Sequence, residues 1–260
     1  MLSLASTADV AAALGSARSI SFLGYMLHPG RVFDALDAAA RRGARVEVRV
    51  EATPYRAGSL GRLNARMVER LARDGADARV GDAIHTKALT ADSVAFYDDC
   101  NWLDRGGDTI VRDAPGDPGI ATTKGDAIAR EVGMLAGARR GDQIELETES
   151  FGNGPVSGAL ARAARAGARV RVLVSSRELR RNPHEAATIA SLEHLGVEVR
   201  RTGANEKFAV VAARTWVGSA NASYGAFDQS DWGAVTDDAA IRAHCESAFE
   251  ERFQRSVRSR

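Results

Sequence analysis

The sequence carries almost no net charge, because its 35 basic residues nearly balance its 34 acidic residues. This balance excludes a global electrostatic attraction to nucleic acid or to an anionic membrane and leaves only local patches to consider. Cysteine is equally scarce: Cys100 and Cys245 fit neither a disulfide framework nor the spacing of a zinc site. We therefore expect two free thiols and a reducing compartment.

Long apolar runs are also missing, since no segment approaches the roughly 20 residues that a membrane-spanning helix needs. Residues 1–19 lack the charged segment followed by an apolar stretch that marks a signal peptide. Together these absences predict a soluble, cytoplasmic protein. The histidines at 184, 194 and 244 have charged helical surroundings and no metal-site spacing, so we predict neither a metal nor a cofactor.

What the sequence does contain is one short pattern written twice, intact in the first copy and altered in the second. The interval from the lysine to the last asparagine is fourteen residues in both copies. The first copy is His85-Thr86-Lys87, Asp92 and Asn101; the second is Asn205-Glu206-Lys207, Ala212 and Gly218-Ser219-Ala220-Asn221.

The sequence around the pattern repeats as well. Strand, helix and strand are predicted at 19–25, 32–42 and 44–50, and again at 143–149, 156–166 and 168–174. Each half then adds a helix, at 60–74 or 185–195, and a short strand before the motif. Such alternation predicts an α/β fold with mixed, mostly parallel sheets flanked by helices.

We predict two pseudo-symmetric halves, residues 1–112 and 126–260, joined by a linker at 113–125 that contains Pro115, Gly116, Pro118 and Gly119. Duplicated units commonly pack about a pseudo-twofold axis, where equivalent residues meet. The duplication therefore predicts one composite site at the interface between the halves.

The intact motif has the chemistry of a phosphate site. Residues two apart on a strand point to the same face, so the side chains of His85 and Lys87 can contact the same bound group. A neighbouring lysine favours the neutral, nucleophilic form of an imidazole. Lysines and asparagine amides can surround the non-bridging oxygens of a phosphoryl group, and histidine is an established covalent nucleophile.

This arrangement resembles the phospholipase D superfamily, whose signature is His-x-Lys-x4-Asp followed by Gly-Ser-x-Asn, twice per active site. His85, Lys87 and Asp92 match the first part completely, and the run from Gly218 to Asn221 matches the second. The resemblance covers nearly the whole chain and implies metal-free phosphodiester cleavage or transfer through a phosphohistidine.

Carried over to this sequence, the resemblance makes His85 the nucleophile and places Lys87, Lys207 and Asp92 in the catalytic set, with Asp92 in a supporting, structural role. The residues implied to bind the phosphate are Asn101, Asn205, Ser219 and Asn221. The pair Asp98-Asp99 stands where Gly-Ser is expected, and two carboxylates there would oppose an anionic substrate if they faced the pocket.

Asn205 is the more serious departure, because an amide cannot donate the proton that the second histidine would supply. General acid catalysis typically contributes 10²–10⁴-fold. The sequence leaves open three ways in which catalysis could proceed without a histidine at position 205. The leaving group could depart unprotonated, another residue could act as the acid, or two chains could pair through their intact halves. His28 is the best candidate for the substitute acid, and Glu206 is the next.

The preferred function is therefore a phosphodiesterase, or a phosphatidyl or phosphoryl transferase, acting on a phospholipid or a nucleic acid. Composition and charge do not choose between these two substrates. The alternative is a catalytically impaired protein that binds a phosphate-containing ligand or a protein partner. The sequence also leaves open whether the protein is a monomer with two halves or a homodimer.

Overall fold

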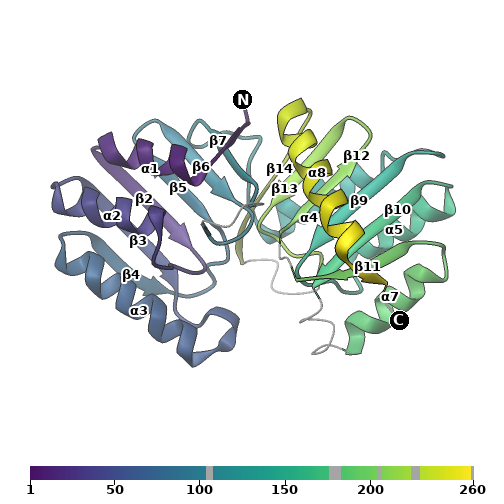
Figure 1. Cartoon of the computed structure of the whole chain (residues 1–260), viewed down its shortest axis with the longest axis horizontal. Helices are drawn as coiled ribbons and strands as arrows, with labels where there is room; N and C mark the ends of the chain where they lie inside the picture. Colours follow the sequence, from purple (N-terminus) through teal and green to yellow (C-terminus); the bar gives the residue numbers. More distant parts are fainter. Residues whose placement is uncertain (104–107, 176–182, 204–205, 224–228, 259–260) are drawn as a thin grey trace. The chain divides into compact units, whose positions relative to one another are not determined.

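The structure, a computed structural model, describes residues 1–103, 108–175, 183–203, 206–223 and 229–258 (Figure 1). These residues divide into two compact units. The first comprises Met1–Ile120 with Gln229–Trp232, and the second comprises Ala121–Asp228 with Gly233–Arg260. The boundary falls within the predicted linker, and residues 229–232 group with the first unit rather than with the half that contains them in sequence.

The first unit is a sheet with one layer of helices. Its elements are β1 (Ser3–Ala5), α1 (Thr7–Ser16), β2 (Ser19–Gly24), α2 (Arg31–Arg41), β3 (Arg45–Glu51), η1 (Pro54–Arg56), α3 (Gly58–Arg73), β4 (Asp77–Gly81), β5 (Ala88–Ala91), β6 (Val94–Asp98) and β7 (Ile110–Asp113). The strand order is β1-β7-β6-β5-β2-β3-β4. In β2, Ile20 and Phe22 are buried against the helices while Ser19 and Ser21 are exposed, as expected for a sheet covered on one face.

The second unit repeats this plan and adds a helix. Its elements are β8 (Ala121–Thr123), α4 (Lys124–Leu135), β9 (Gln143–Thr148), α5 (Pro155–Arg165), β10 (Arg169–Ser175), α7 (Pro183–Glu193), β11 (Glu198–Thr202), β12 (Phe208–Val211), β13 (Arg214–Gly218), β14 (Ser230–Thr236), α8 (Ala239–Arg255) and β15 (Val257–Arg258). The strand order is β15-β11-β10-β9-β12-β13-β14-β8. Helix α8 packs on β9, β11, β12 and β13.

The predicted α/β class with two similar halves and mixed sheets is confirmed, but the expectation of mostly parallel pairing is wrong. Parallel pairs join β2 to β3 and β3 to β4, and in the second unit β9 to β10 and β10 to β11. Antiparallel pairs are more numerous: they are the hairpins β5–β6 and β12–β13, and also β1–β7, β6–β7, β2–β5, β9–β12, β13–β14 and β11–β15. Each hairpin turns through a residue with positive φ, Asp92 or Ala212, and a turn this tight connects only antiparallel strands.

Glycines end the helices where the sequence predicts their ends. Gly43 and Gly167 follow α2 and α5 with φ of +85° and +93°, a region that residues with a Cβ seldom enter. The elements that the sequence analysis missed are those outside the obvious repeat: α1, α4, β1, β7 and β14. None of the described helices is long and apolar enough to cross a bilayer.

Two buried polar side chains fix the loops that follow the first long strand of each unit. Asn64, on α3, accepts from the Leu27 amide (3.0 Å) and donates to the Tyr25 and Glu51 carbonyl oxygens (3.0 and 2.8 Å). Glu185, on α7, accepts from the Phe151 amide. Both side chains are fully buried. The repeat therefore extends to how the two loops beside the motifs are held.

Glu131 on α4 is a charged residue type inside the core of the second unit. Its side chain is 2% exposed, and its Oε2 has no hydrogen-bond partner among the described residues. Burial raises the pKa of Glu131 to about 8. The folded second unit therefore holds this carboxyl protonated near neutral pH.

We expect the second unit to lose stability as pH rises from about 4.5 to about 8, because the folded state keeps a proton that the unfolded chain releases. Each pKa unit of difference corresponds to about 1.4 kcal/mol. Glu131→Gln should remove this slope, as followed by urea unfolding across that pH range. The exposed Glu69→Gln is the matched control, and an unchanged slope in Glu131→Gln would contradict the assignment.

Candidate active site

One edge of the first sheet collects the residues of the intact motif. The parallel strands β2, β3 and β4 all end at this edge. Strand β5 is antiparallel to β2 and pairs Ala88 with Leu23, so the segment from His85 to Lys87 enters the sheet where β2 leaves it. Polar residues at strand ends therefore gather at this edge, where packing does not require them.

The backbone around His85 is held on both sides. The Ile84 amide donates to Glu51 Oε2 at the end of β3 (2.9 Å). The His85 amide donates to the Ser230 carbonyl, and the Ser230 amide donates to the Ala83 carbonyl, each at 3.0 Å. This parallel bridge brings the start of β14 beside the motif, although about 145 residues of chain separate them.

The decisive contact follows from this bridge. His85 Nδ1 lies 2.7 Å from Asp231 Oδ1, and the Asp231 carboxylate is fully buried. Gln229 Nε2 donates to the other carboxylate oxygen at 3.1 Å. A carboxylate can only accept here, so His85 Nδ1 carries the proton of this contact. The sequence analysis assigned no role to Asp231.

Lys87 and Tyr25 complete the surroundings of the imidazole. Lys87 is 1% exposed and donates from Nζ to the His85 carbonyl at 2.7 Å. The Tyr25 ring lies edge-on to the His85 ring, with centroids 4.7 Å apart, and Lys87 Nζ lies 5.3 Å from the Tyr25 centroid. His85 and Lys87 thus lie together, as predicted, and the Tyr25 ring packs against both of them.

The Asp98-Asp99 departure has a structural explanation. Both residues are fully buried. Asp98 Oδ2 accepts from the Trp102 amide, and Asp99 Oδ1 accepts from the Thr109 amide at 3.0 Å. Their carboxylates thus bind the backbone amides of Trp102 and Thr109. The Asn101 side chain is buried, and its Oδ1 has no hydrogen-bond partner among the described residues.

Asp92 lies at the other end of β5 from His85 and Lys87. Its carboxylate accepts from the Ser19 amide at 2.9 Å and from the Arg18 amide at 3.1 Å. These bonds fix the start of β2. Ala212 makes the equivalent turn with nearly the same φ, 52° against 50°. Asp92 therefore supports the sheet, and its place in the motif reflects structure rather than contact with a substrate.

In the second unit the matching edge holds Lys207, Ser219 and Asn221, all from the second copy. Lys207 is 1% exposed, and its Nζ lies 3.6 Å from Glu149 Oε2. Asn221 Oδ1 accepts from the Ser150 amide at 3.1 Å, and Ser219 is fully buried. Asn205 lies outside the described residues.

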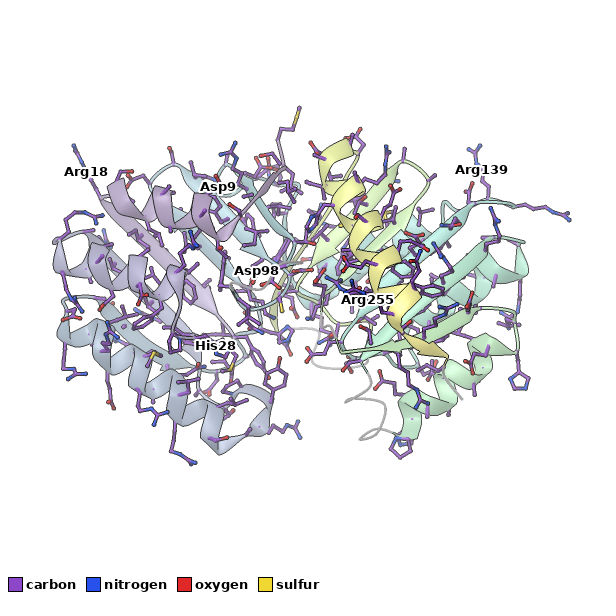
Figure 2. The ribbon with its side chains drawn as sticks, viewed as in Figure 1. Asp9, Arg18, His28, Asp98, Arg139 and Arg255 are labelled. Atoms are coloured by element: carbon purple, nitrogen blue, oxygen red, sulfur yellow. The ribbon has the colours of Figure 1, made fainter. Side chains whose placement is uncertain are left out.

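The two candidate substitute acids differ in their surroundings. Arg252 on α8 binds the Glu206 carboxylate and also Glu147 Oε2, the latter at 2.8 Å. Glu206 is 4% exposed and tied to this arginine, which disfavours it as a proton donor to a substrate. His28 is half-buried in the loop after β2 (Figure 2). The pairing of Leu23 with Ala88 puts the end of β2 next to the start of β5, which follows His85 in the chain.

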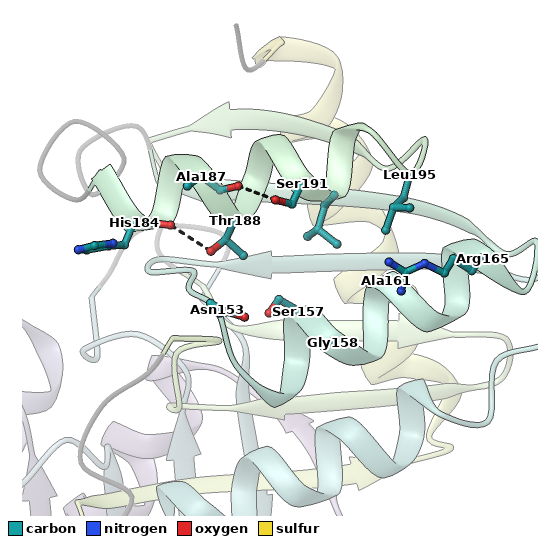
Figure 3. A pocket seen from close by; sticks show the side chains of 11 residues that line it. Asn153, Ser157, Gly158, Ala161, Arg165, His184, Ala187, Thr188, Ser191 and Leu195 are labelled. Carbon is teal, nitrogen blue, oxygen red and sulfur yellow. Dashed lines mark hydrogen bonds between the residues drawn. The ribbon is translucent and has the colours of Figure 1, made fainter.

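A hollow of about 430 Å³ lies elsewhere in the second unit, between α5 and α7 (Figure 3). Its hydroxyl groups serve their own helices: Thr188 donates to the His184 carbonyl and Ser191 to the Ala187 carbonyl, each at 3.0 Å. These two hydroxyl groups are thus engaged within α7, and we assign the groove no chemistry. Within the described ranges, no group of three or more His, Cys, Asp or Glu is placed to hold a metal ion.

Comparison with known families agrees with this geometry. The family model described as "Cardiolipin synthase, PLD-like domain" matches residues 132–253, which is most of the second unit. This match supports the assignment of the second unit to the phospholipase D superfamily. The resemblance proposed from the motifs is thereby confirmed, and the first unit supplies the intact motif that the matched region lacks. No curated protein sequence matches the chain.

Solved structures share the fold at low sequence identity. Phosphatidylserine synthase from Haemophilus influenzae Rd KW20 is 12% identical, with a TM-score of 0.65 over 99% of this chain and 87% of that one. Polyphosphate kinase from Porphyromonas gingivalis is 16% identical, with a TM-score of 0.63 over 95% of this chain. The chain spans 45% of the length of that kinase.

We expect the neutral imidazole of His85 to exist as one tautomer, protonated on Nδ1, because Asp231 Oδ1 accepts that proton. Two-bond ¹H–¹⁵N spectra should show an unprotonated Nε2 in the wild type and mixed tautomers in Asp231→Ala. The tautomer of His194, whose Nδ1 lies 2.7 Å from the Ala190 carbonyl oxygen, should not change. A wild-type spectrum with the proton on Nε2 would contradict the geometry.

Proposed function

We propose that this protein is a phosphodiesterase or a phosphatidyl or phosphoryl transferase that works through a phosphohistidine at His85. The observation that carries the proposal is the 2.7 Å contact between His85 Nδ1 and the buried Asp231 carboxylate. It orients the imidazole, directs Nε2 toward an electrophile and compensates the positive charge that forms when Nε2 bonds to phosphorus.

Lys87 and Asn101 are the proposed phosphate ligands of the first unit. Lys87 lies beside the imidazole, where its ammonium group favours the charge on non-bridging phosphate oxygens. Asn101 precedes Trp102 and Thr109, whose backbone amides donate to the buried carboxylates of Asp98 and Asp99. The amide of Asn101 can donate to a phosphate oxygen, so this copy supplies a nucleophile and two ligands.

The second unit enters the proposal through the repeated motif. We propose that Lys207, Asn205, Ser219 and Asn221 are the phosphate ligands of the second copy, each in the role of its counterpart. Asn221 Oδ1 is engaged with the Ser150 amide, which leaves the amide NH₂ group as the donor that a phosphate oxygen would meet.

The substrate class is a phosphodiester, either of a phospholipid or of a nucleic acid. The structural relatives named above are, by their names, a phosphatidylserine synthase and a polyphosphate kinase, and both names imply chemistry at a phosphoryl group. Phosphatidyl transfer and phosphodiester hydrolysis differ only in whether an alcohol or water resolves the intermediate.

A rival function is binding without turnover, and one observation favours it. Glu149 lies 3.6 Å from Lys207 and offsets part of the positive charge that the second copy would offer a phosphate. Together with asparagine at 205, this predicts weaker transition-state stabilisation. Such a protein would bind a phosphate-containing ligand or a protein partner and release no product.

We expect the purified chain to release p-nitrophenol from bis-p-nitrophenyl phosphate in the presence of EDTA, since this leaving group needs little protonation. His85→Ala should reduce the release to the uncatalysed background, because the covalent step loses its nucleophile. The assay is the absorbance of p-nitrophenolate at several pH values.

His194→Ala is the matched control, because His194 is an exposed histidine in the second unit. Its release should equal that of the wild type. If the wild type shows no His85-dependent release at any pH, the enzymatic proposal fails and the binding function takes its place.

A further inference from the structure

Three aromatic rings lie in a row from His85 to the surface of the first unit. The Tyr25 ring meets the His85 ring edge-on, with centroids 4.7 Å apart. On its other contact the Tyr25 ring meets the Tyr55 ring, with centroids 4.9 Å apart and ring planes at 73°. The His85 side chain is 11% exposed, Tyr25 is half-buried and Tyr55 is 40% exposed. Tyr55 thus presents an exposed aromatic ring one residue removed from the ring that contacts the nucleophile.

The backbone that carries Tyr55 has an unusual conformation. Tyr55 and Arg56 have φ of 53° and 51°, in the left-handed region that residues with a Cβ seldom enter. Two consecutive residues of this size persist there only where the surrounding structure imposes the conformation. Part of that restraint is direct, because the Tyr55 amide donates to the Tyr25 hydroxyl oxygen. The position of the exposed ring is therefore fixed by the ring beside His85.

The segment before Tyr55 is fixed to the motif as well. Glu51, at the end of β3, accepts at Oε1 from the Thr53 amide (3.1 Å) and at Oε2 from the Ile84 amide (2.9 Å). One carboxylate therefore holds both the segment that leads to Tyr55 and the segment that leads to His85. The two segments belong to one compact unit, so the ring and the imidazole keep a defined separation.

We propose that Tyr55 is a specificity-determining residue whose ring stacks on a base of a single-stranded nucleic acid while a phosphodiester of that strand lies at His85. The inference rests on the proposed function and deepens it, because it chooses nucleic acid over phospholipid. It adds a base-binding residue that lies outside the repeated motif, and it uses residues of the first unit alone.

The chemistry beside His85 suits a single strand. Every base has a π face, so an aromatic side chain can stack on any of them, provided that the base is not already stacked in a duplex. The exposed Arg56 adds a positive charge next to the ring, which suits the phosphates of the backbone. A sugar separates a base from its phosphate, so a base on Tyr55 and a phosphate at His85 can belong to one nucleotide or to adjacent nucleotides.

The exposed apolar side chains favour a base over an acyl chain. Among the described residues, the large hydrophobic side chains that are exposed are Met1, Leu23, Tyr55 and Val80. A lipid surface requires a contiguous apolar patch, usually of several hundred Å². A single ring next to a guanidinium group offers instead the combination of stacking and charge that single strands bind.

The test compares two esters that share the p-nitrophenol leaving group and differ in the group that stays on phosphorus. They are the p-nitrophenyl ester of thymidine 5′-phosphate and methyl p-nitrophenyl phosphate. We expect the wild type to have a KM for the thymidine ester about 5- to 150-fold below that for the methyl ester, the range that stacking of one base provides. The measurement is the initial rate of p-nitrophenol release in EDTA over a range of ester concentrations.

Tyr55→Asn should raise KM for the thymidine ester far more than for the methyl ester and change kcat little, because stacking binds ground state and transition state alike. Asparagine tolerates the left-handed backbone and lacks the ring, so the fold is retained. Tyr55→Phe keeps the ring and should keep most of the preference. Val80→Asn removes another exposed apolar side chain of the first unit and is the matched control, with both KM values equal to those of the wild type.

Two results would overturn the proposal. The first is equal KM values for the two esters in the wild type, or an equal rise for both in Tyr55→Asn. The second is a stronger preference for the p-nitrophenyl ester of a short-chain diacylglycerol phosphate that Tyr55→Asn removes, which would assign the ring to a lipid.

Binding distinguishes failure of this proposal from failure of the proposed function. If p-nitrophenol release does not depend on His85, the proposed function fails, and fluorescence anisotropy then decides the role of Tyr55. The probes are a labelled oligothymidylate and a labelled abasic strand of the same length. The wild type should bind the oligothymidylate more tightly, and Tyr55→Asn should remove the difference. Equal affinities in the wild type would contradict the base-binding role.

Discussion

The carboxylate of Asp231 holds His85 by a 2.7 Å contact, and most features of the intact motif serve to make that contact possible. The start of β14 must lie beside the chain at Ala83 and His85, which a two-bond backbone bridge achieves. Glu51 fixes the neighbouring Ile84 amide. A buried carboxylate is costly unless its oxygens are engaged, and here His85 and Gln229 engage one each. The orientation of one imidazole thus organises the end of the sheet.

The two copies of the motif have diverged in charge while the fold around them has stayed alike. Asn64 and Glu185 anchor equivalent loops from equivalent helices. The residues that follow β2 and β9 differ. The aromatic ring of Tyr25 lies near Lys87, whereas the carboxyl group of Glu149 lies near Lys207.

Sequence periodicity predicted the repeated core well, because strands such as β2 alternate buried and exposed residues and glycines mark the ends of α2 and α5. It failed where the signal was weak or non-local. The sequence pattern of two short strands does not show whether they pair in parallel or antiparallel fashion, so the sequence analysis overestimated the number of parallel strand pairs. Asp231 could not be paired with His85, since the contact depends on a bridge between segments far apart in sequence. Glu206 looked available because the sequence does not show that Arg252 binds it.

The central claim, that His85 becomes covalently phosphorylated, is tested most directly by trapping the intermediate. Wild-type protein in excess over bis-p-nitrophenyl phosphate is quenched in alkaline denaturant, which preserves phosphohistidine, and the intact mass and peptide masses are measured. We predict an added p-nitrophenyl phosphoryl group on the peptide that contains His85, and none in His85→Ala. Release of p-nitrophenol with no adduct, or with the adduct on another residue, would contradict the account.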